Sequence, residues 1–205
     1  MKQRLDKLMA ERGLVRTRSE AESWIRLGRV KVNGVVISKV GAFISDSAVI
    51  VLDAPERYVS RAGLKLASVA HLLKLDFTDK IVLDVGSSTG GFTDYALQHG
   101  AKRVYAVDVG TDQLHPALRN DKRIELYEKT DIRQFIPKDT PDIVVIDVSF
   151  ISLRDILPYV AAIIDRHTIV VAMVKPQFEA RRNQLGSSGV VKNDTVRRQI
   201  IRDFE

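Results

Sequence analysis

The chain has no cysteine among its 205 residues. Disulfides, thiolate metal sites and cysteine nucleophiles are therefore excluded, and the composition favours a reducing compartment such as the cytoplasm. The sequence also lacks any apolar run close to the roughly 18 residues of a membrane helix, and its basic N-terminus leads into no signal-peptide core. These absences predict a cytoplasmic globular protein with no membrane partner and no metal site.

Positive charge is unevenly distributed along the chain, which has a formal net charge of +6. Residues 1–60 hold 11 Lys/Arg and 7 Asp/Glu, a net charge of +4, whereas the remaining residues hold 21 and 19, a net charge of +2. We interpret the excess in the first third as a footprint for nucleic acid, with a merely solvated surface as the alternative.

The first third of the chain predicts a small unit of two helices and a hairpin. One helix is expected over residues 3–12, and a second from near Ser19 to Leu27. The spacings Thr17-x-x-Glu20 and Ser19-x-x-Glu22 both fit a capping box at the start of the second helix. Asn33-Gly34 lies between two β-branched runs and indicates a hairpin turn, and a strand over residues 48–52 completes the unit.

This unit resembles the RNA-binding S4 domain, and the segment from Gly28 to Gly34 is the most specific part of the resemblance. Its basic side chains are expected to neutralise phosphates, which supplies affinity without reading sequence. Trp24 fits the core better than a base-stacking platform, because it shares helical spacing with Ala21 and Ile25. The side chains expected to contact RNA are Arg4, Lys7, Arg12, Arg16, Arg18, Arg26, Arg29 and Lys31.

From residue 60 the pattern changes to alternating helices and buried strands. This alternation predicts an α/β fold, a Rossmann-like doubly wound parallel sheet with helices on both faces. Strands are expected at residues 81–85, 103–107, 124–127, 142–147 and 168–174. A helix is expected at residues 61–74, and the stretches 91–99, 112–120 and 154–165 are expected to be helical or partly helical.

A glycine-rich loop follows the first of these strands. The apolar run that starts at Ile81 ends in an acid, Asp84, and the loop leads into a helix near Asp94. Its spacing matches neither the dinucleotide motif nor a Walker loop. An acid before the loop suits a ligand with a positive amine, and that ligand resembles S-adenosylmethionine. The residues expected to hold it here are Asp84, Gly86, Ser88, Thr89, Gly90 and Gly91.

Polar residues also end the later strands. Asp108 is placed as a ribose-hydroxyl acceptor, with a helix N-cap as the alternative. Asp131, followed by Ile132, is expected at the adenine end of the same pocket. Asp147 and Lys175 each end an apolar strand, and because a buried lysine is costly without a carboxylate, we expect these two residues to pair.

Four motifs in series resemble the TlyA family, the hemolysin A-type ribosomal RNA 2′-O-methyltransferases that join an S4 domain to an FtsJ-like methyltransferase domain. The motifs are Arg57 to Lys65, Asp84 to Asp94, Asp147 to Ser152 and Lys175 to Glu179, and the match covers essentially the whole chain. The resemblance implies S-adenosylmethionine as methyl donor, cytidine ribose as target, and ribosomal RNA or ribosomal subunits as partners.

The resemblance also implies a Lys-Asp-Lys-Glu catalytic set. Lys65, Asp147 and Lys175 match its first three members, whereas the fourth, a glutamate, has no counterpart before residue 205. We favour Lys175 as the base, Lys65 as its electrostatic partner, and Asp147 as the group that orients Lys175 or the donor. The expected domains are an S4-like domain over residues 1–56, a linker over 57–63, and a C-terminally incomplete methyltransferase domain over 64–205.

Other reactions and functions fit the sequence less well. Methylation at a cytosine carbon usually needs a cysteine nucleophile, and methylation of an exocyclic amine usually carries an Asn/Asp-Pro-Pro-aromatic stretch where this chain has Asp147-Val-Ser-Phe150. Two alternatives from other classes are an RNA-binding protein with an inactive donor pocket and a membrane-active hemolysin. The second lacks an amphipathic pore-forming run.

Overall fold

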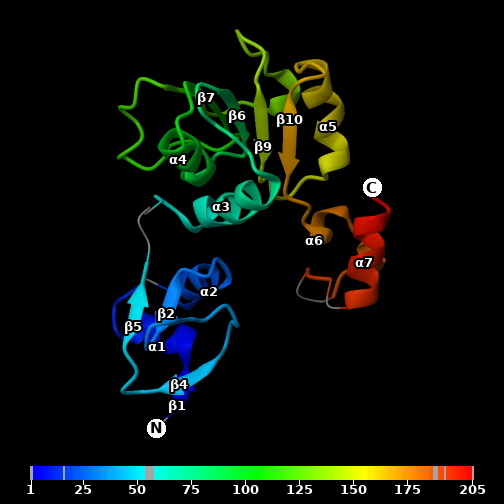
Figure 1. Cartoon of the computed structure of the whole chain (residues 1–205). Helices are drawn as coiled ribbons and strands as arrows, with labels where there is room; N and C mark the ends of the chain where they lie inside the picture. Colours follow the sequence, from blue (N-terminus) through cyan, green and yellow to red (C-terminus); the bar gives the residue numbers. More distant parts are fainter. Residues whose placement is uncertain (1, 16, 54–57, 187–188, 192, 205) are drawn as a thin grey trace. The chain divides into compact units, whose positions relative to one another are not determined.

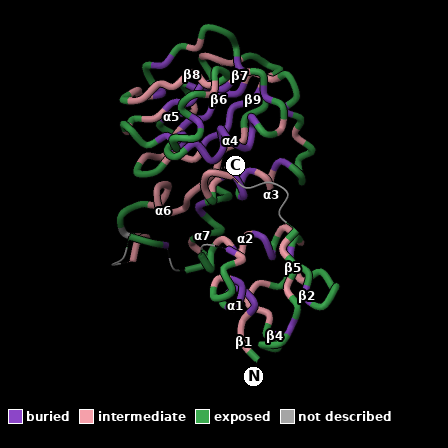
Figure 2. The backbone as a smooth tube through the Cα atoms, turned by 90° about the vertical axis from the view of Figure 1, so that its left-hand side faces the viewer, coloured by how far each residue is buried: buried purple, intermediate pink, exposed green. Residues whose placement is uncertain are grey.

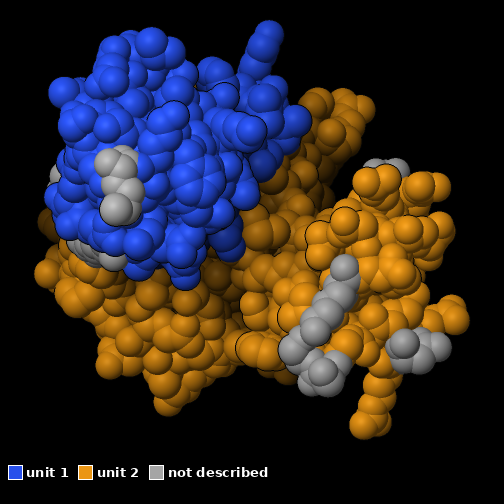
Figure 3. Space-filling view, turned by 90° about the horizontal axis from the view of Figure 1, so that it is seen from below, with its two compact units in different colours: residues 1–75 blue, residues 76–205 orange. Residues whose placement is uncertain are grey.

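The computed structural model describes residues 2–15, 17–53, 58–186, 189–191 and 193–204 (Figure 1). The chain divides into two compact units, residues 1–75 and 76–205 (Figure 3). The first unit includes helix α3 (Arg61–Leu73), so this division falls later than the expected start of the methyltransferase domain at residue 64, which stays a prediction. None of the helices in the described part of the chain combines the length and apolar character of a bilayer-spanning segment.

The two predicted helices of the first unit are present. Helix α1 (Leu5–Glu11) begins two residues later than expected, because strand β1 (Lys2–Arg4) pairs antiparallel with an unpredicted strand, β4 (Phe43–Ser45). Helix α2 (Arg18–Arg26) follows the N-cap residue Thr17, whose hydroxyl accepts a hydrogen bond from the Glu20 amide at 3.2 Å. The expected capping interaction therefore starts this helix.

The predicted hairpin is confirmed. Strands β2 (Val30–Val32) and β3 (Val35–Val36) pair antiparallel, and β5 (Ile50–Leu52) adds to the other edge of β2. Asn33 and Gly34 both have positive φ, 48° and 83°, the conformation that a tight two-residue hairpin turn requires. The Asn33 side chain also accepts a hydrogen bond from the Val49 amide, which holds β5 in place.

Trp24 lies in the core of the first unit, as expected, with 5% of its surface exposed. It packs in a cluster that also contains Leu64 of α3. The first turn of α3 carries Gly63, where a Cβ atom would lie 2.5 Å from the Tyr58 side chain. Tyr58 therefore packs directly on the α3 backbone, and α3 joins this core through Leu64.

The second unit contains the five predicted parallel strands in the order β10-β9-β6-β7-β8. The central strands are almost fully buried, whereas β8 and β10 at the edges are partly exposed (Figure 2). The strands are β6 (Ile81–Val85), β7 (Arg103–Val107), β8 (Ile124–Tyr127), β9 (Ile143–Ile146) and β10 (Ile169–Ala172).

Helices cover both faces of this sheet. Helix α5 (Leu153–Ala162) and the short helix η1 (Ile132–Gln134) share a core with alternate residues of β6, β7 and β9. Helix α4 (Gly91–Gln98) contacts β6 and β7. Its Thr93 donates to Asp84 of β6, whose side chain lies on the opposite face of the sheet from Leu83 and Val85. The doubly wound α/β fold is therefore confirmed. The remaining helices are α6 (Pro176–Glu179), η2 (Arg182–Gln184) and α7 (Asp194–Arg202).

The helical stretch expected over residues 112–120 is wrong. The structure has turns there, with Asp112 at φ 57° and Pro116 in the middle of the segment. Because proline has no amide hydrogen and clashes with the preceding helical turn, the segment does not propagate a helix. The Arg119 guanidinium instead donates to the Leu114 carbonyl at 2.9 Å.

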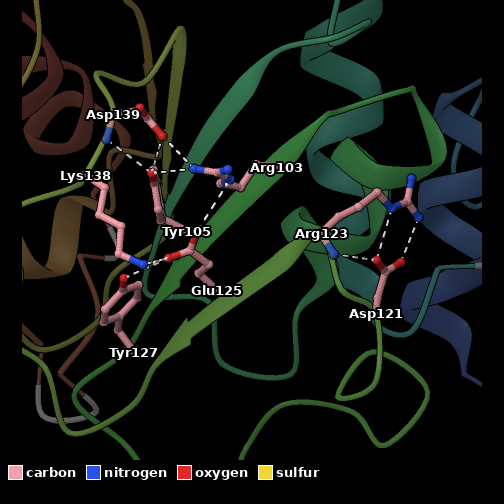
Figure 4. Close-up of polar contacts among 8 residues, drawn as sticks. All are labelled: Arg103, Tyr105, Asp121, Arg123, Glu125, Tyr127, Lys138 and Asp139. Atoms are coloured by element: carbon pink, nitrogen blue, oxygen red, sulfur yellow. Dashed lines mark hydrogen bonds and ion pairs between the residues drawn. The ribbon is translucent and has the colours of Figure 1, made fainter.

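Hydrogen bonds and ion pairs connect β7 and the edge strand β8 to the segment before β9 (Figure 4). Arg103, at the start of β7, donates to Asp139 at 2.5 Å and to the Tyr105 hydroxyl at 3.3 Å. On β8, Glu125 accepts from Lys138 at 3.0 Å, and this hydrogen bond lowers the pKa of Glu125. These contacts tie residues 138–139 to β7 and β8.

Candidate active site

A cavity of about 360 Å³ lies where the loops after β6, β7, β8 and β9 meet. These loops follow the carboxyl ends of parallel strands, and the strand order reverses between β6 and β9. Ligands in open α/β sheets bind in the crevice at such a point. Six of the predicted site residues line the cavity: Gly86, Ser88, Asp108, Asp131, Ile132 and Asp147.

Two glycines of the loop after β6 occupy positions where a side chain does not fit. Gly86 has φ 81°, and a Cβ atom there would lie 3.0 Å from the Asp147 carbonyl oxygen. Gly90 has φ 86°, and its Cβ would lie 2.6 Å from methyl groups of Leu114 and Leu118. The loop can therefore press against the tip of β9 on one side and residues 114–118 on the other.

Asp84 is buried beneath this loop, with 1% of its surface exposed. Its Oδ2 accepts hydrogen bonds from the amide and the hydroxyl of Thr93, at 2.9 and 2.7 Å. The N-cap residue of α4 is Gly90, which has no side chain, so Asp84 supplies the missing acceptor from the neighbouring strand. Burial raises the pKa of Asp84 to about 7.

The other oxygen of this carboxylate, Oδ1, has no hydrogen-bond partner within the described ranges of the chain. A buried acceptor without a partner suits a cationic ligand group or its bound water. The described residues that line the cavity nevertheless do not include Asp84, Thr89, Gly90 or Gly91. Their direct contact with a donor stays a prediction.

Asp108 joins the loops after β6 and β7. Its Oδ2 accepts from the Ser88 amide at 2.8 Å, and its Oδ1 accepts from the Gly110 amide at 2.7 Å. A carboxylate offers about four acceptor sites, so lone pairs remain for a ribose diol. None of the described helices begins at Asp108, so the helix N-cap alternative is wrong. Asp108 braces the two loops and occupies the position expected for a ribose contact, which stays a prediction.

Asp131 and Ile132 form the wall after β8. Asp131 accepts from the Arg133 amide at 2.9 Å and pairs with the Arg133 guanidinium at 2.6 Å, which lowers the pKa of the carboxyl. Ile132 is 6% exposed and supplies an apolar surface. An apolar wall with an adjacent carboxylate suits a purine ring with an amino group, and the adenine contact stays a prediction.

Asp147 and Lys175 pair as the sequence predicts. The Lys175 ammonium lies 2.6 Å from Asp147 Oδ1, and the side chains are 18% and 13% exposed. Lys175 also donates to the Ser149 hydroxyl at 2.9 Å. The ammonium is therefore held in one place by two side chains from the loop after β9.

Two residues that sequence reasoning did not select complete this part of the site. Glu179 accepts from the Ser152 hydroxyl at 2.5 Å and the Leu153 amide at 2.8 Å, so the segment after Lys175 caps the N-terminus of α5. The place of Glu179 in the motif from Lys175 to Glu179 indicated that it belongs to the site, but the motif does not show which groups it binds.

Phe150 is the second residue of the site that sequence reasoning did not select. It lines the cavity, is 93% exposed and has φ 66°, a conformation that costs a non-glycine residue roughly 1 kcal/mol or more. Its ring packs against Phe178 with centroids 5.3 Å apart. An exposed aromatic ring held in a strained backbone at a cavity suits stacking on a base. The positive φ of this phenylalanine leaves no trace in the sequence pattern.

Several basic side chains of the first unit have protein partners. Asp6 has no exposed side-chain surface, and Arg4 and Arg18 pair with it at 2.9 and 2.8 Å. These hydrogen bonds lower the pKa of Asp6 to about 2. Arg12 donates to the Ala48 carbonyl at 2.7 Å and also to the Asp46 carbonyl.

The remaining basic residues of the predicted RNA-binding set make weaker contacts within the protein or are exposed. Lys7 pairs with Glu11 on the surface at 3.3 Å, and Lys31 is exposed on β2. The side chain of Arg26 is 70% exposed and 4.0 Å from Glu22. Arg16 lies outside the described residues. RNA contact by the predicted basic set, Arg29 included, stays a prediction.

Lys65 is exposed on α3, in the first unit, whereas Asp147 and Lys175 belong to the second. The catalytic set of these three residues stays a prediction.

Comparisons with known proteins agree with this geometry. A model of the FtsJ-like methyltransferase family matches residues 58–205, and a model of the S4 domain matches residues 3–50. The "16S/23S rRNA (cytidine-2'-O)-methyltransferase TlyA" of Mycobacterium tuberculosis is 37% identical, over 97% of this chain and 76% of the relative.

Two further relatives are more similar in sequence. The "Putative rRNA methyltransferase YqxC" of Bacillus subtilis is 45% identical, over 98% of this chain and 73% of the relative. The solved structure titled "Putative hemolysin from Streptococcus thermophilus" superposes with a TM-score of 0.70 at 43% identity, over 99% of this chain and 76% of that one. The resemblance expected from the four motifs is thereby confirmed.

Proposed function

The chain belongs to the TlyA family of FtsJ-like methyltransferases that carry an N-terminal S4 domain, and from this premise we propose that it methylates the ribose 2′-hydroxyl of a cytidine in ribosomal RNA, with S-adenosylmethionine as donor. The observation that carries the proposal is the Asp147–Lys175 pair beside the cavity at the sheet's carboxyl edge. A lysine amine fixed at that place suits an oxygen nucleophile that must lose its proton.

The donor pocket fits the residues present. Gly86 and Ser88 would hold the amino-acid end, Asp108 the ribose diol, and Ile132 with Asp131 the adenine ring. The unpartnered Oδ1 of Asp84 beneath the loop supports a cationic group above it. When bound, S-adenosylmethionine supplies an electrophilic methyl group on a sulfonium.

The chain's own residues would prepare the hydroxyl. Lys175, as the neutral amine, would accept the proton of the 2′-hydroxyl while the oxygen attacks the methyl carbon and the methyl–sulfur bond breaks, which leaves a neutral thioether as the leaving group. The ammonium so formed would stabilise the negative charge that develops on the oxygen. Asp147 and Ser149 hold the ammonium in position, so little reorganisation is needed during the reaction. Lys65 would contribute a second positive charge. Such preorganised donors typically contribute about 10²–10³-fold to a rate.

The S4 domain would supply RNA affinity through phosphate contacts, and the exposed ring of Phe150 would pack against the base beside the cavity. Ribosomal RNA, free or in assembled subunits, is therefore the proposed partner. The target cytidine follows from the printed activity of the Mycobacterium tuberculosis relative.

The test maps ribose methylation on ribosomal RNA. RNA from cells with and without the gene is read by primer extension at low nucleotide triphosphate, where 2′-O-methyl groups cause stops. A stop at a cytidine that requires the gene, and that purified protein restores with donor present, supports the proposal. Identical stop patterns in both strains, together with no restored stop, would instead favour an RNA-binding protein with an inactive pocket.

A further inference from the structure

A polar groove of about 470 Å³ lies between α2 and the first turn of α3, entirely within the first unit. Its lining carries three cations, Arg26, Arg61 and Lys65, and one carboxylate, Glu22. The rest of the lining is small and mostly hydroxylic: Ser19, Ser23, Ser60 and Ala62. The groove thus combines excess positive charge with hydrogen-bonding side chains.

The single acid of the groove does not cancel this charge. Glu22 lies 3.8 Å from Arg4 and 4.0 Å from Arg26, so its carboxylate is shared by two guanidinium groups. Counting the lining alone, three cations and one anion leave a formal charge of +2. Guanidinium groups bind phosphate through paired N–H donors, so the chemistry of the groove suits a phosphate.

Arg61 and Lys65 are exposed and four residues apart on α3. That spacing places both side chains on one face of the helix, about one turn apart. Ser60 precedes them as N-cap, and its hydroxyl accepts from the Ala62 amide at 3.3 Å. The positive end of the α3 dipole therefore adds to the two side-chain charges.

We propose that this groove binds the RNA phosphate that flanks the methylated ribose. The inference rests on the proposed function, in which Lys65 acts at the ribose 2′-oxygen. In RNA the 2′-oxygen and the 3′-phosphate are attached to adjacent carbons of one sugar. A lysine that reaches the 2′-oxygen therefore leaves the phosphate within reach of a side chain one helical turn away, and Arg61 is that side chain. Arg26 contacts the same phosphate from α2.

A phosphate held in this way fixes the sugar without reading the base. The groove would then set which ribose along the RNA chain meets Lys65. Loss of an arginine should weaken RNA binding and productive positioning, but should not change binding of the methyl donor.

The test compares Arg26→Gln and Arg61→Gln with wild type, using ribosomal RNA from cells that lack the gene. Filter binding across a salt series gives the slope of log affinity against log salt concentration. Each variant should reduce the magnitude of this slope by about 0.7–0.9, the value for one lost phosphate contact. The KM for RNA should rise about tenfold, as expected for a lost charge-assisted hydrogen bond, with kcat changed far less. Arg61→Lys should keep part of the slope.

Lys74→Gln is the matched control, because it removes one charge at the opposite end of α3 and does not line the groove. It should keep the wild-type slope. Donor affinity by calorimetry should be unchanged in every variant, which shows that the second unit is folded, and wild-type melting curves should show the same for the first unit. If wild type methylates RNA but both arginine variants keep its slope and KM, the groove proposal is wrong and the proposed function stands. If wild type methylates no RNA, the proposed function fails, and with it the assignment of this phosphate.

Discussion

The carboxylate of Asp84 on β6 caps helix α4 by accepting two hydrogen bonds from Thr93, the third residue of that helix. Strand, glycine loop and helix are thereby joined beneath the predicted donor pocket. Because the carboxylate is buried, its pKa of about 7 lies above the unfolded value of 3.8. A carboxyl whose pKa is raised by folding contributes stability below pH 3.8, and this contribution is lost as the pH rises to about 7.

Asp84→Asn should therefore change stability in a pH-dependent way. The amide oxygen can still accept from Thr93, but it carries no charge to desolvate. The melting temperature of the variant minus that of wild type should therefore be larger at pH 8, where wild-type Asp84 is charged, than at pH 5. Melting curves of both proteins at pH 5 and pH 8 measure this shift. The same shift at both pH values would contradict a buried Asp84 that titrates between them.

Asp6 should show the opposite pH dependence. Its pKa falls from 3.8 to about 2 because Arg4 and Arg18 bind the carboxylate, so its contribution is present above pH 3.8 and lost toward pH 2. Asp6→Asn should lower the free energy of unfolding at pH 7 by about 2 kcal/mol. Urea unfolding measures this loss. The control is Glu11→Gln, which removes an exposed pair with Lys7 and should cost less than about 1 kcal/mol.

Lys175→Ala should reduce methyl transfer to RNA by about 10²–10³-fold or more, because the preorganised ammonium is lost. Asp147→Asn should also slow transfer, since it releases the ammonium from its partner. Donor affinity, measured by calorimetry, should stay near the wild-type value in Lys175→Ala. The control is Lys80→Ala, which removes a half-exposed lysine of the same unit. Wild-type primer-extension stops produced by Lys175→Ala would refute its catalytic role.

Phe150 allows the base contact and the backbone strain to be separated. Phe150→Gly and Phe150→Ala both remove the ring and should raise the KM for RNA similarly, with donor affinity unchanged. Glycine also relieves the φ of 66°, so the glycine variant should be more stable than the alanine variant by about 1 kcal/mol. Equal stability of the two variants would show that the residue is not strained in solution. An unchanged KM for RNA would refute the proposed contact between Phe150 and the base.

The buried strands of the second unit could be predicted to within two residues, because each is a continuous apolar run such as Ile143–Ile146. The Asn33-Gly34 turn and the Thr17 cap were equally readable, since each depends on local chemistry. Strands β1 and β4 were missed. Their pairing joins residues about 40 positions apart, and β1 is the polar segment Lys2–Arg4, without alternation of apolar residues.

In the candidate site, too, features that depend on neighbouring residues could be predicted, whereas contacts between distant segments could not. Position after an apolar strand was sufficient to pair Asp147 with Lys175. Position did not show that Asp84 faces Thr93 beneath the loop, or that Asp6 binds Arg4 and Arg18. Residue type gives the charge of a side chain, but its partner depends on packing between segments that are not neighbours in sequence.

Gly86 has one further consequence. The hydrogen that it carries in place of a side chain leaves only contact distance to the main chain at Asp147, so the predicted donor side and the predicted nucleophile side of the pocket share a single wall. Any substitution that widened one side would narrow or displace the other. Selection for a different donor would therefore disturb the methyl-accepting machinery in the same step, which restricts how far the two specificities can diverge independently during evolution.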